Sequence, residues 1–292
     1  MLKSIYIAWC RLLTRISPVL NNQFIYLVFY RKILHLHHPQ TMHEKLVYLK
    51  LNQYNENRLV KTCADKYAVR SYLRSKGLEG ILVPLIASYD NIDSIDWSAL
   101  PQKFAMKINY GCGYNIICKD KAKLDEKAAI IKLKKWVREE KYLNEAELQY
   151  KDVPLKIIVE KYLQPASGDL PSDYKIYCFN GKPMVILYMN DRGKKTKAAF
   201  FDMNWKYISA PISKKGYVQL DELPAKPICI EQMKEIARIL SQPFPFVRID
   251  LYCVDSKIYF GEMTFTPASG LFTSECLIEG RPMGDYLKIK IN

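Results

Sequence analysis

The stretch that decides the fold is Arg248–Pro267, RIDLYCVDSKIYFGEMTFTP, in which two apolar runs flank a short polar turn. Both runs are rich in β-branched and aromatic residues, and this pattern predicts a β-hairpin. Each run also carries one acid, Asp250 in the first and Glu262 in the second. These two acids need a reason, because like charges that face each other across neighbouring strands destabilise a sheet.

The register of the hairpin decides whether the two acids meet. Side chains alternate between the faces of a strand, so Arg248 shares a face with Asp250, and Glu262 shares a face with Thr264. A three-residue loop at 255–257 places Asp250 opposite Glu262 and Arg248 opposite Thr264. A two-residue loop turns the acids to opposite faces. From these residues alone, a hairpin with one wet face remains an open alternative.

Paired acids would suit a divalent cation. Mg²⁺ takes hard oxygen ligands and often uses one or two carboxylates together with substrate phosphates. The metal hypothesis therefore needs a free space between Asp250 and Glu262. An arginine or lysine side chain that fills this space would count against it.

A second motif, QKFAMKINYGCGYNIICKD (102–120), predicts two strands around a turn, with Lys107 in the first strand. The turn is Gly111-Cys112-Gly113, and glycines let backbone N–H groups approach phosphate oxygens closely. The motif is neither a Walker A loop nor a complete dinucleotide-binding fingerprint. A simple β-turn therefore stays open as an alternative.

Two further segments hold charged residues near a segment rich in Pro, Gly and Ser at 164–173. The strand LKIIVEKYL brings Glu160 to a hinge position, where its carboxylate is placed to meet a ribose and its backbone a purine. The strand after the linker carries Asp173 and Lys175 on one face, and Lys175 is placed to reach a phosphate. An edge strand with an exposed acid and a surface ion pair are the alternatives.

Composition limits the class of protein and its compartment. The 292 residues suffice for two or three lobes, and the net charge of +14 favours anionic partners such as nucleotides, acidic glycans or lipid headgroups. The eight cysteines include no C-x-x-C pair, so we expect reduced thiols in the cytoplasm. No recognisable DNA- or RNA-binding motif is present, and we expect no nucleic-acid partner.

The N-terminal stretch is apolar and basic, with Arg11 and Arg15 interrupting it too early for a secretion signal. An amphipathic helix on an anionic membrane, at the inner face of the bilayer, is one interpretation. A helix packed on the body of the protein is the other, and we slightly favour it. Residues 1–60 are predicted to be helical, 61–163 to form a smaller α+β lobe and 164–292 a larger one.

The motifs follow one another in a fixed order: HPQTMHEKLVYLKL, DKYAVRSYL, LPQKFAMKINYGCG, DYKIYCFNGKP, VRIDLY and FGEMTFTPASG. This order resembles the ATP-grasp superfamily, and within it the TupA-like branch of teichuronopeptide biosynthesis, which is associated with surface-polysaccharide gene clusters. The resemblance implies an α+β ATP-grasp fold, in which two α+β lobes clasp ATP after a helical N-terminal region. The Gly-rich loop would lie in the lobe 61–163, and the metal-binding hairpin in the lobe 164–292.

The resemblance also implies roles for the residues of these motifs. Arg248 and Lys175 would be catalytic, with Arg248 steadying a phosphate or an acyl phosphate. Thr264 stands where many ATP-grasp ligases have Asn, which puts a second metal site in doubt. The metal ligands, for Mg²⁺, would be Asp250, Glu262 and Thr264. The ATP-binding residues would be Lys107, Gly111, Cys112, Gly113, Glu160, Lys161, Tyr162, Leu163, Asp173 and Lys175.

The activity that the resemblance implies is a carboxylate–amine ligase that forms an amide through an acyl phosphate. Its partners would be an acidic glycan or uronic-acid-containing precursor and an amino acid or amine, in capsular or cell-surface polysaccharide biosynthesis. The loop Asp191–Lys197 is a candidate for the acceptor side, or an ordinary solvated turn. Two alternatives remain: a glycan phosphotransferase on the same fold, and a non-catalytic basic module that binds a polyanion or a membrane.

Overall fold

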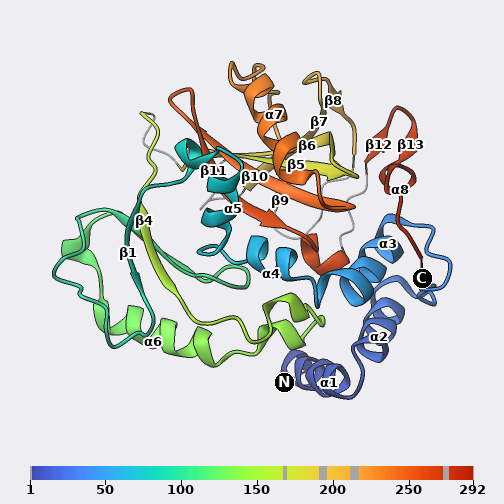
Figure 1. Ribbon diagram of the computed structural model, residues 1–292, viewed down its shortest axis with the longest axis horizontal. Helices are drawn as coiled ribbons and strands as arrows, with labels where there is room; N and C mark the ends of the chain where they lie inside the picture. Colours follow the sequence, from blue (N-terminus) through green and yellow to red (C-terminus); the bar gives the residue numbers. More distant parts are fainter. Residues whose placement is uncertain (1, 167–169, 191–195, 211–216, 272–275, 292) are drawn as a thin grey trace.

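Two sheets organise the chain in the computed structural model, which describes residues 2–166, 170–190, 196–210, 217–271 and 276–291. Figure 1 shows the small sheet beside the large one, with helices packed around both. This arrangement confirms the predicted α+β class and the helical N-terminal region. None of the helices in the described ranges combines the length and the hydropathy that crossing a bilayer requires.

Helices and short helical turns fill the first part of the chain. The Thr41 hydroxyl accepts a hydrogen bond from the Glu44 amide at 3.2 Å, and the Glu44 carboxylate accepts one from the Thr41 amide at 3.0 Å. This reciprocal capping box explains why a helix starts at Met42. The elements are α1 (Leu2–Ile16), α2 (Pro18–Tyr30), α3 (Met42–Leu49), the π-helix η1 (Lys50–Tyr54), α4 (Arg58–Ala64), α5 (Val69–Ser75) and η2 (Glu79–Ile81).

The small sheet has four antiparallel strands in the order β1-β4-β2-β3. Helix α6 lies along its lower side in Figure 1 and packs Leu133 among the buried side chains of β2 and β4, such as Phe104 and Val159. The elements are β1 (Leu85–Tyr89), β2 (Phe104–Ile108), β3 (Asn115–Cys118), η3 (Lys121–Lys123), α6 (Glu126–Arg138), η4 (Lys141–Leu143), η5 (Leu148–Tyr150) and β4 (Ile157–Lys161).

The large sheet runs β11-β10-β5-β6-β7-β8, and β9 pairs in parallel with β7. Asn180 and Gly181 both have positive φ, which is the conformation that an Asn-Gly hairpin turn between β5 and β6 requires. The elements are β5 (Ser172–Phe179), β6 (Lys182–Asn190), β7 (Thr196–Asp202), β8 (Tyr207–Ile208), β9 (Tyr217–Gln219), α7 (Ile230–Ser241), β10 (Phe246–Val254), β11 (Lys257–Thr264), η6 (Pro267–Gly270), β12 (Leu277–Ile278), β13 (Arg281–Pro282) and α8 (Met283–Tyr286).

Helices cover the large sheet from two sides, with α7 above it and α4 below it in Figure 1. Buried side chains of α3 to α5, such as Leu46 and Leu73, belong to one hydrophobic core with Phe246 of β10. The Tyr54 hydroxyl donates to the Phe246 carbonyl at 2.8 Å and fixes η1 to the same strand. This packing groups α4 and α5 with the large sheet, and the division of the chain at residues 60 and 163 stays a prediction.

Candidate active site

One face of the large sheet carries a row of charged residues from three neighbouring strands. Across the ladder of β10 and β11, Asp250 pairs with Glu262 and Arg248 pairs with Thr264. Across the ladder of β10 and β5, Asp250 pairs with Lys175. Residues that pair directly project from the same face, so the strands bring these five side chains together.

The turn of the hairpin decides between the two loop lengths that the sequence left open. The turn has two residues, Asp255 and Ser256, both with positive φ, and Val254 pairs with Lys257. The two-residue alternative is therefore the observed one, but the expectation that it turns the acids to opposite faces is wrong, because Asp250 pairs with Glu262. A β-bulge at Gly261 adds one residue to β11 and returns the second acid to the face of the first.

Asp250 is the most heavily bonded residue of this face. Its carboxylate accepts hydrogen bonds from Nε and Nη2 of Arg248, both at 2.6 Å, and from Nζ of Lys175 at 2.5 Å. Lys175 also forms an ion pair with Asp173 at 2.8 Å. Burial alone would raise the pKa of Asp250, but Arg248 and Lys175 together hold it below its ordinary value. The acid is therefore an anion buried between two cations.

The space between the two acids is not free, because Arg248 lies there. Its Nη2 atom is 3.5 Å from Oε1 of Glu262, and the Thr264 hydroxyl donates to the same oxygen at 3.3 Å. Both oxygens of Asp250 bond to Arg248 and Lys175, so Asp250 can ligate a metal only if one of them turns away. The predicted set of Mg²⁺ ligands therefore fits in part. Glu262 and Thr264 offer hard oxygens, whereas both oxygens of Asp250 already accept hydrogen bonds from Arg248 and Lys175.

Among the described residues, no group of three or more His, Cys, Asp or Glu side chains is arranged to hold a metal ion. The role of Asp250, Glu262 and Thr264 as metal ligands stays a prediction.

On the small sheet, Lys107 and Glu160 lie beside each other. Ala105 pairs with Glu160 and Lys107 with Ile158, so the two charged residues are diagonal neighbours on one face. Nζ of Lys107 is 2.7 Å from Oε2 of Glu160, and Nη1 of Arg70 is 3.4 Å from Oε1. Burial lowers the pKa of Lys107, but Glu160, with smaller contributions from Tyr252 and Glu262, outweighs this effect, so the pKa is raised overall.

The predicted hinge segment continues from Glu160 to Leu163. The Lys161 side chain is exposed, and its amide donates to the Pro84 carbonyl at 2.9 Å. The Tyr162 side chain is buried, and its hydroxyl has no hydrogen-bond partner among the described residues. The role of this segment in holding a purine and a ribose stays a prediction.

The Gly-rich turn joins β2 to β3 as predicted, and both of its glycines have positive φ. A Cβ atom on Gly111 would lie 3.1 Å from the Tyr114 ring. Two lysines hold the turn by its carbonyls: Lys66 donates to Gly111 at 2.6 Å and Lys141 to Cys112 at 3.0 Å. The Cys112 side chain itself is exposed.

Lys66 is a site residue that the sequence analysis did not identify. Its amide donates to the Asn109 carbonyl at 2.8 Å, which anchors it beside the Gly-rich turn. Its Nζ atom also lies 4.0 Å from Oε2 of Glu262 on the large sheet. Burial lowers the pKa of Lys66, and the nearby Lys107 lowers it further. The motif DKYAVRSYL contained this lysine, but nothing local indicated that its side chain points to the seam between the sheets.

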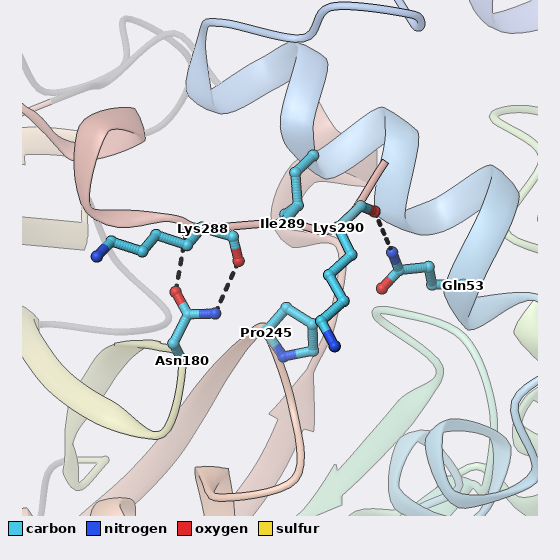
Figure 2. Close-up of a pocket in the computed structure, with 6 residues that line it drawn as sticks. All are labelled: Gln53, Asn180, Pro245, Lys288, Ile289 and Lys290. Atoms are coloured by element: carbon cyan, nitrogen blue, oxygen red, sulfur yellow. Dashed lines mark hydrogen bonds between the residues drawn. The ribbon is translucent and has the colours of Figure 1, made fainter. Parts of the chain in front are cut away.

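Two cavities bear on the position of the site. One cavity, of about 490 Å³, lies at the tip of the β5–β6 hairpin. Figure 2 shows that the Asn180 side chain there bonds both backbone groups of Lys288, and that the Gln53 side chain donates to the Lys290 carbonyl. None of the predicted site residues lines this cavity. A second cavity of about 150 Å³ adjoins the Gly-rich turn, with Gly111 and Tyr150 in its lining.

The loop Asp191–Lys197 and the linker lie partly outside the described residues.

Comparisons with solved structures find partial likenesses. D-alanine–D-alanine ligase from Bacillus anthracis is 16% identical, with 70% of this chain and 57% of that chain covered and a TM-score of 0.42. N5-carboxyaminoimidazole synthase from Aspergillus clavatus is 11% identical (70% and 45% covered, TM-score 0.40). The ATP-grasp ligase PsnB, complexed with Mg and ADP, is 13% identical (77% and 58% covered, TM-score 0.35). The chain thus spans between 45% and 58% of the length of these proteins.

No curated protein matches the chain significantly. The family model described as TupA-like ATPgrasp matches residues 44–288. This range holds the strand lysine Lys107, the Gly-rich turn and the hairpin of Asp250 and Glu262 in the expected order. The match covers most of the chain, and it shows that the protein belongs to the TupA-like ATP-grasp family.

Proposed function

We propose that the protein is an ATP-dependent ligase that joins a carboxylate to an amine through an acyl phosphate. Membership of the ATP-grasp family supports this activity. The observation that carries the proposal is a group of four cations on the side of Glu262. Arg248 lies 3.5 Å and Lys66 lies 4.0 Å from this carboxylate, and Lys107 and Lys175, which pair with other acids, feel its charge at longer range.

Such a cluster suits a triphosphate. Lys107 comes from the small sheet and Lys175 and Arg248 come from the large sheet, whereas Lys66 lies between α4 and α5 and contacts the Gly-rich turn. A polyphosphate between the sheets would meet positive charge from both sides, which is how enzymes stabilise a transferring phosphoryl group. When bound, Mg²⁺ would add charge neutralisation at the phosphates, and Glu262 and Thr264 are the residues placed to hold it.

The proposed reaction has two steps. A carboxylate oxygen of the acceptor bonds to the γ-phosphorus of ATP, the bond from that phosphorus to the bridging oxygen breaks, and ADP leaves. The amine nitrogen then bonds to the acyl carbon, inorganic phosphate leaves with the electron pair of the broken C–O bond, and the nitrogen loses a proton. The chain's cations lower the repulsion between the carboxylate and the triphosphate, which is the main barrier to the first step.

For the substrates we propose an acidic sugar, such as a uronic acid in a capsular or cell-surface polysaccharide precursor, and an amino acid or amine. The net charge of +14 supports a polyanionic acceptor. We place the reaction in the cytoplasm, and all eight cysteines being free supports a reducing compartment.

The test is ATP turnover by the full chain with Mg²⁺ and defined acceptors. Glucuronic acid, galacturonic acid and their oligomers are each combined with a mixture of the standard amino acids, and ADP and phosphate are measured. Hydroxylamine is added in a parallel series, because it captures an acyl phosphate as a hydroxamate. We expect ADP and phosphate only when acid and amine are both present, and a hydroxamate when hydroxylamine replaces the amine.

Other outcomes would refute the proposal in distinct ways. A phosphorylated glycan formed without an amine would identify a phosphotransferase. A thermal-shift assay that shows stabilisation by polyanions but none by Mg-ATP would identify a binding module without catalysis.

A further inference from the structure

Helix α2 buries two asparagines beside Ile25 and Tyr26, and it leaves several other apolar side chains exposed. The Asn21 side chain is 0% exposed, and Asn22 is buried beside it. The Asn21 amide donates to the Thr14 hydroxyl at 2.6 Å and to the Asn144 carbonyl at 2.9 Å. On the opposite side, Leu20 and Leu27 are exposed, at a spacing of seven residues that keeps them on one face.

Helix α1 is oriented in the same sense. Its Thr14 side chain is buried and donates to the Leu143 carbonyl at 2.7 Å, and Nε of Arg11 donates to Asn144 at 2.8 Å. Its polar side therefore faces the body of the protein. The opposite side is an apolar stripe at the spacing i, i+4, i+7, i+11, all of it exposed. This stripe consists of Ile5, Trp9, Leu12 and Ile16.

We name these six exposed side chains, four from α1 and two from α2, the outer apolar face. Its members lie on two helices that contact each other through the rings of Tyr6 and Phe24. Figure 1 shows α1 and α2 at the lower edge of the molecule, away from α7 at the top. Exposed apolar surface of this extent, with polar groups committed to the interior, indicates a binding surface.

The segment that carries the outer apolar face is basic. Before Glu44 the sequence contains five Lys or Arg residues and no Asp or Glu. Arg11 and Arg15 lie on the side of the body, where Arg15 pairs with Glu140. Arg31 and Lys32 are exposed where α2 ends, and the next residue, Ile33, is 72% exposed. A partner for this surface should therefore have an apolar interior beneath a negatively charged surface.

We propose that α1 and α2 dock the protein on the surface of an anionic lipid bilayer. An interfacial helix buries its apolar face at the boundary between headgroups and acyl chains, and nearby basic residues bind anionic headgroups. Trp9 at the centre of the stripe suits this depth, because an indole ring prefers the membrane interface. Under this proposal the two interpretations of the N-terminus are compatible, because the polar sides of the helices pack on the body while their apolar sides meet lipid.

The experiment is co-sedimentation of the full chain with vesicles, in the absence of ATP. Vesicles of phosphatidylcholine with added phosphatidylglycerol are compared with vesicles of phosphatidylcholine alone. We expect binding to the anionic vesicles, weakened by salt, and little binding to the neutral ones. Trp9→Glu should reduce the partition by at least about tenfold, and Arg31→Gln and Lys32→Gln by about fivefold each.

Ile228→Glu is the matched control, because Ile228 is 86% exposed and precedes α7, far from α1 in Figure 1. It should bind vesicles like the unchanged protein. Circular dichroism melts show that each variant is folded. Equal binding to neutral and anionic vesicles, or equal binding by Trp9→Glu and Ile228→Glu, overturns the proposal. Light scattering that shows a dimer without lipid, converted to a monomer by Trp9→Glu, would assign the face to a second copy of the chain instead.

Discussion

Asp250 lies opposite Glu262 across the ladder of β10 and β11, although the turn between the strands has only two residues. In a regular hairpin with this turn, the second acid would face the opposite side of the sheet. The bulge at Gly261 corrects the register by one residue. A Cβ atom at this position would lie 2.9 Å from the Asp250 carbonyl oxygen, so the bulge requires glycine. The candidate site therefore depends on a residue without a side chain.

Gly261→Ala should damage both stability and activity. The added methyl group forces the two strands apart, at a cost of about 1–3 kcal/mol in the free energy of unfolding. It also redirects the Glu262 carboxylate, so ATP turnover should fall. Gly80→Ala is the control, because a Cβ atom there meets nothing within 4 Å. Urea denaturation and ATP turnover measure the two effects, and equal values for both variants would contradict the role of the bulge.

Glu262→Gln should spare the fold and abolish activity. The Glu262 side chain is 37% exposed, so we expect the free energy of unfolding to change by less than about 0.5 kcal/mol. The loss of charge beside the four cations should lower ATP turnover by about 100-fold or more. Turnover close to that of the unchanged protein would remove Glu262 from the site.

Asp250→Asn should behave differently, because this buried anion neutralises both Arg248 and Lys175. Removing it takes the shared anion from both buried cations and leaves only Asp173 beside Lys175 and Glu262 beside Arg248, at a cost of about 3–5 kcal/mol in the free energy of unfolding. A variant as stable as Glu262→Gln would show that the ion network does not stabilise the fold.

The same network predicts an acid transition. The folded-state pKa of Asp250 is below its ordinary value of 3.8, so the folded state binds its proton more weakly than the unfolded state does. Its contribution to stability is therefore full at neutral pH and is lost as the pH falls below 3.8. The difference in stability between the unchanged protein and Asp250→Asn should shrink over this range, as followed by urea denaturation. A difference that stays constant in acid would contradict the lowered pKa.

Lys66→Met should weaken ATP binding with little effect on the fold. Methionine keeps most of the apolar stem, but it removes the ammonium group between the Gly111 carbonyl and Glu262. We expect a loss of affinity for ATP of about tenfold or more, since hydrogen bonds to charged groups contribute about 1.5–3 kcal/mol. Lys61→Met is the control, since Lys61 pairs with the exposed Glu56 away from the seam. Equal ATP affinity in both variants, by calorimetry, would exclude Lys66.

Glu145 predicts a pH dependence of the opposite sign. Burial, together with Glu147, raises the pKa of Glu145 from 4.5 to about 7. Between these values the folded state binds more protons than the unfolded state, so this group makes stability fall as the pH rises. Glu145→Gln should flatten that slope and raise the melting temperature at pH 8. Identical slopes from pH 5 to pH 7 in both proteins would show that Glu145 titrates normally.

Local sequence determined much of the fold and part of the site. The two-residue period of strands placed Asp173 with Lys175, and Arg248 with Asp250, on common faces, and the structure keeps both pairs together. The Asn180-Gly181 turn and the strands on either side of the Gly-rich turn also follow from local patterns. These features could be predicted because they depend on the conformations of residues that are close neighbours in the chain.

The tertiary structure decided which charges meet. Lys66 reaches Gly111 across 45 positions of sequence because the small sheet lies beside the large one, and it reaches Glu262 because its segment packs beside the large sheet. The position of Arg248 between the two acids, and the outward turn of the apolar stripe of α1, likewise depend on what packs against each element. Electrostatic energy depends on distance in space, and sequence patterns report distance only along one strand or one helix.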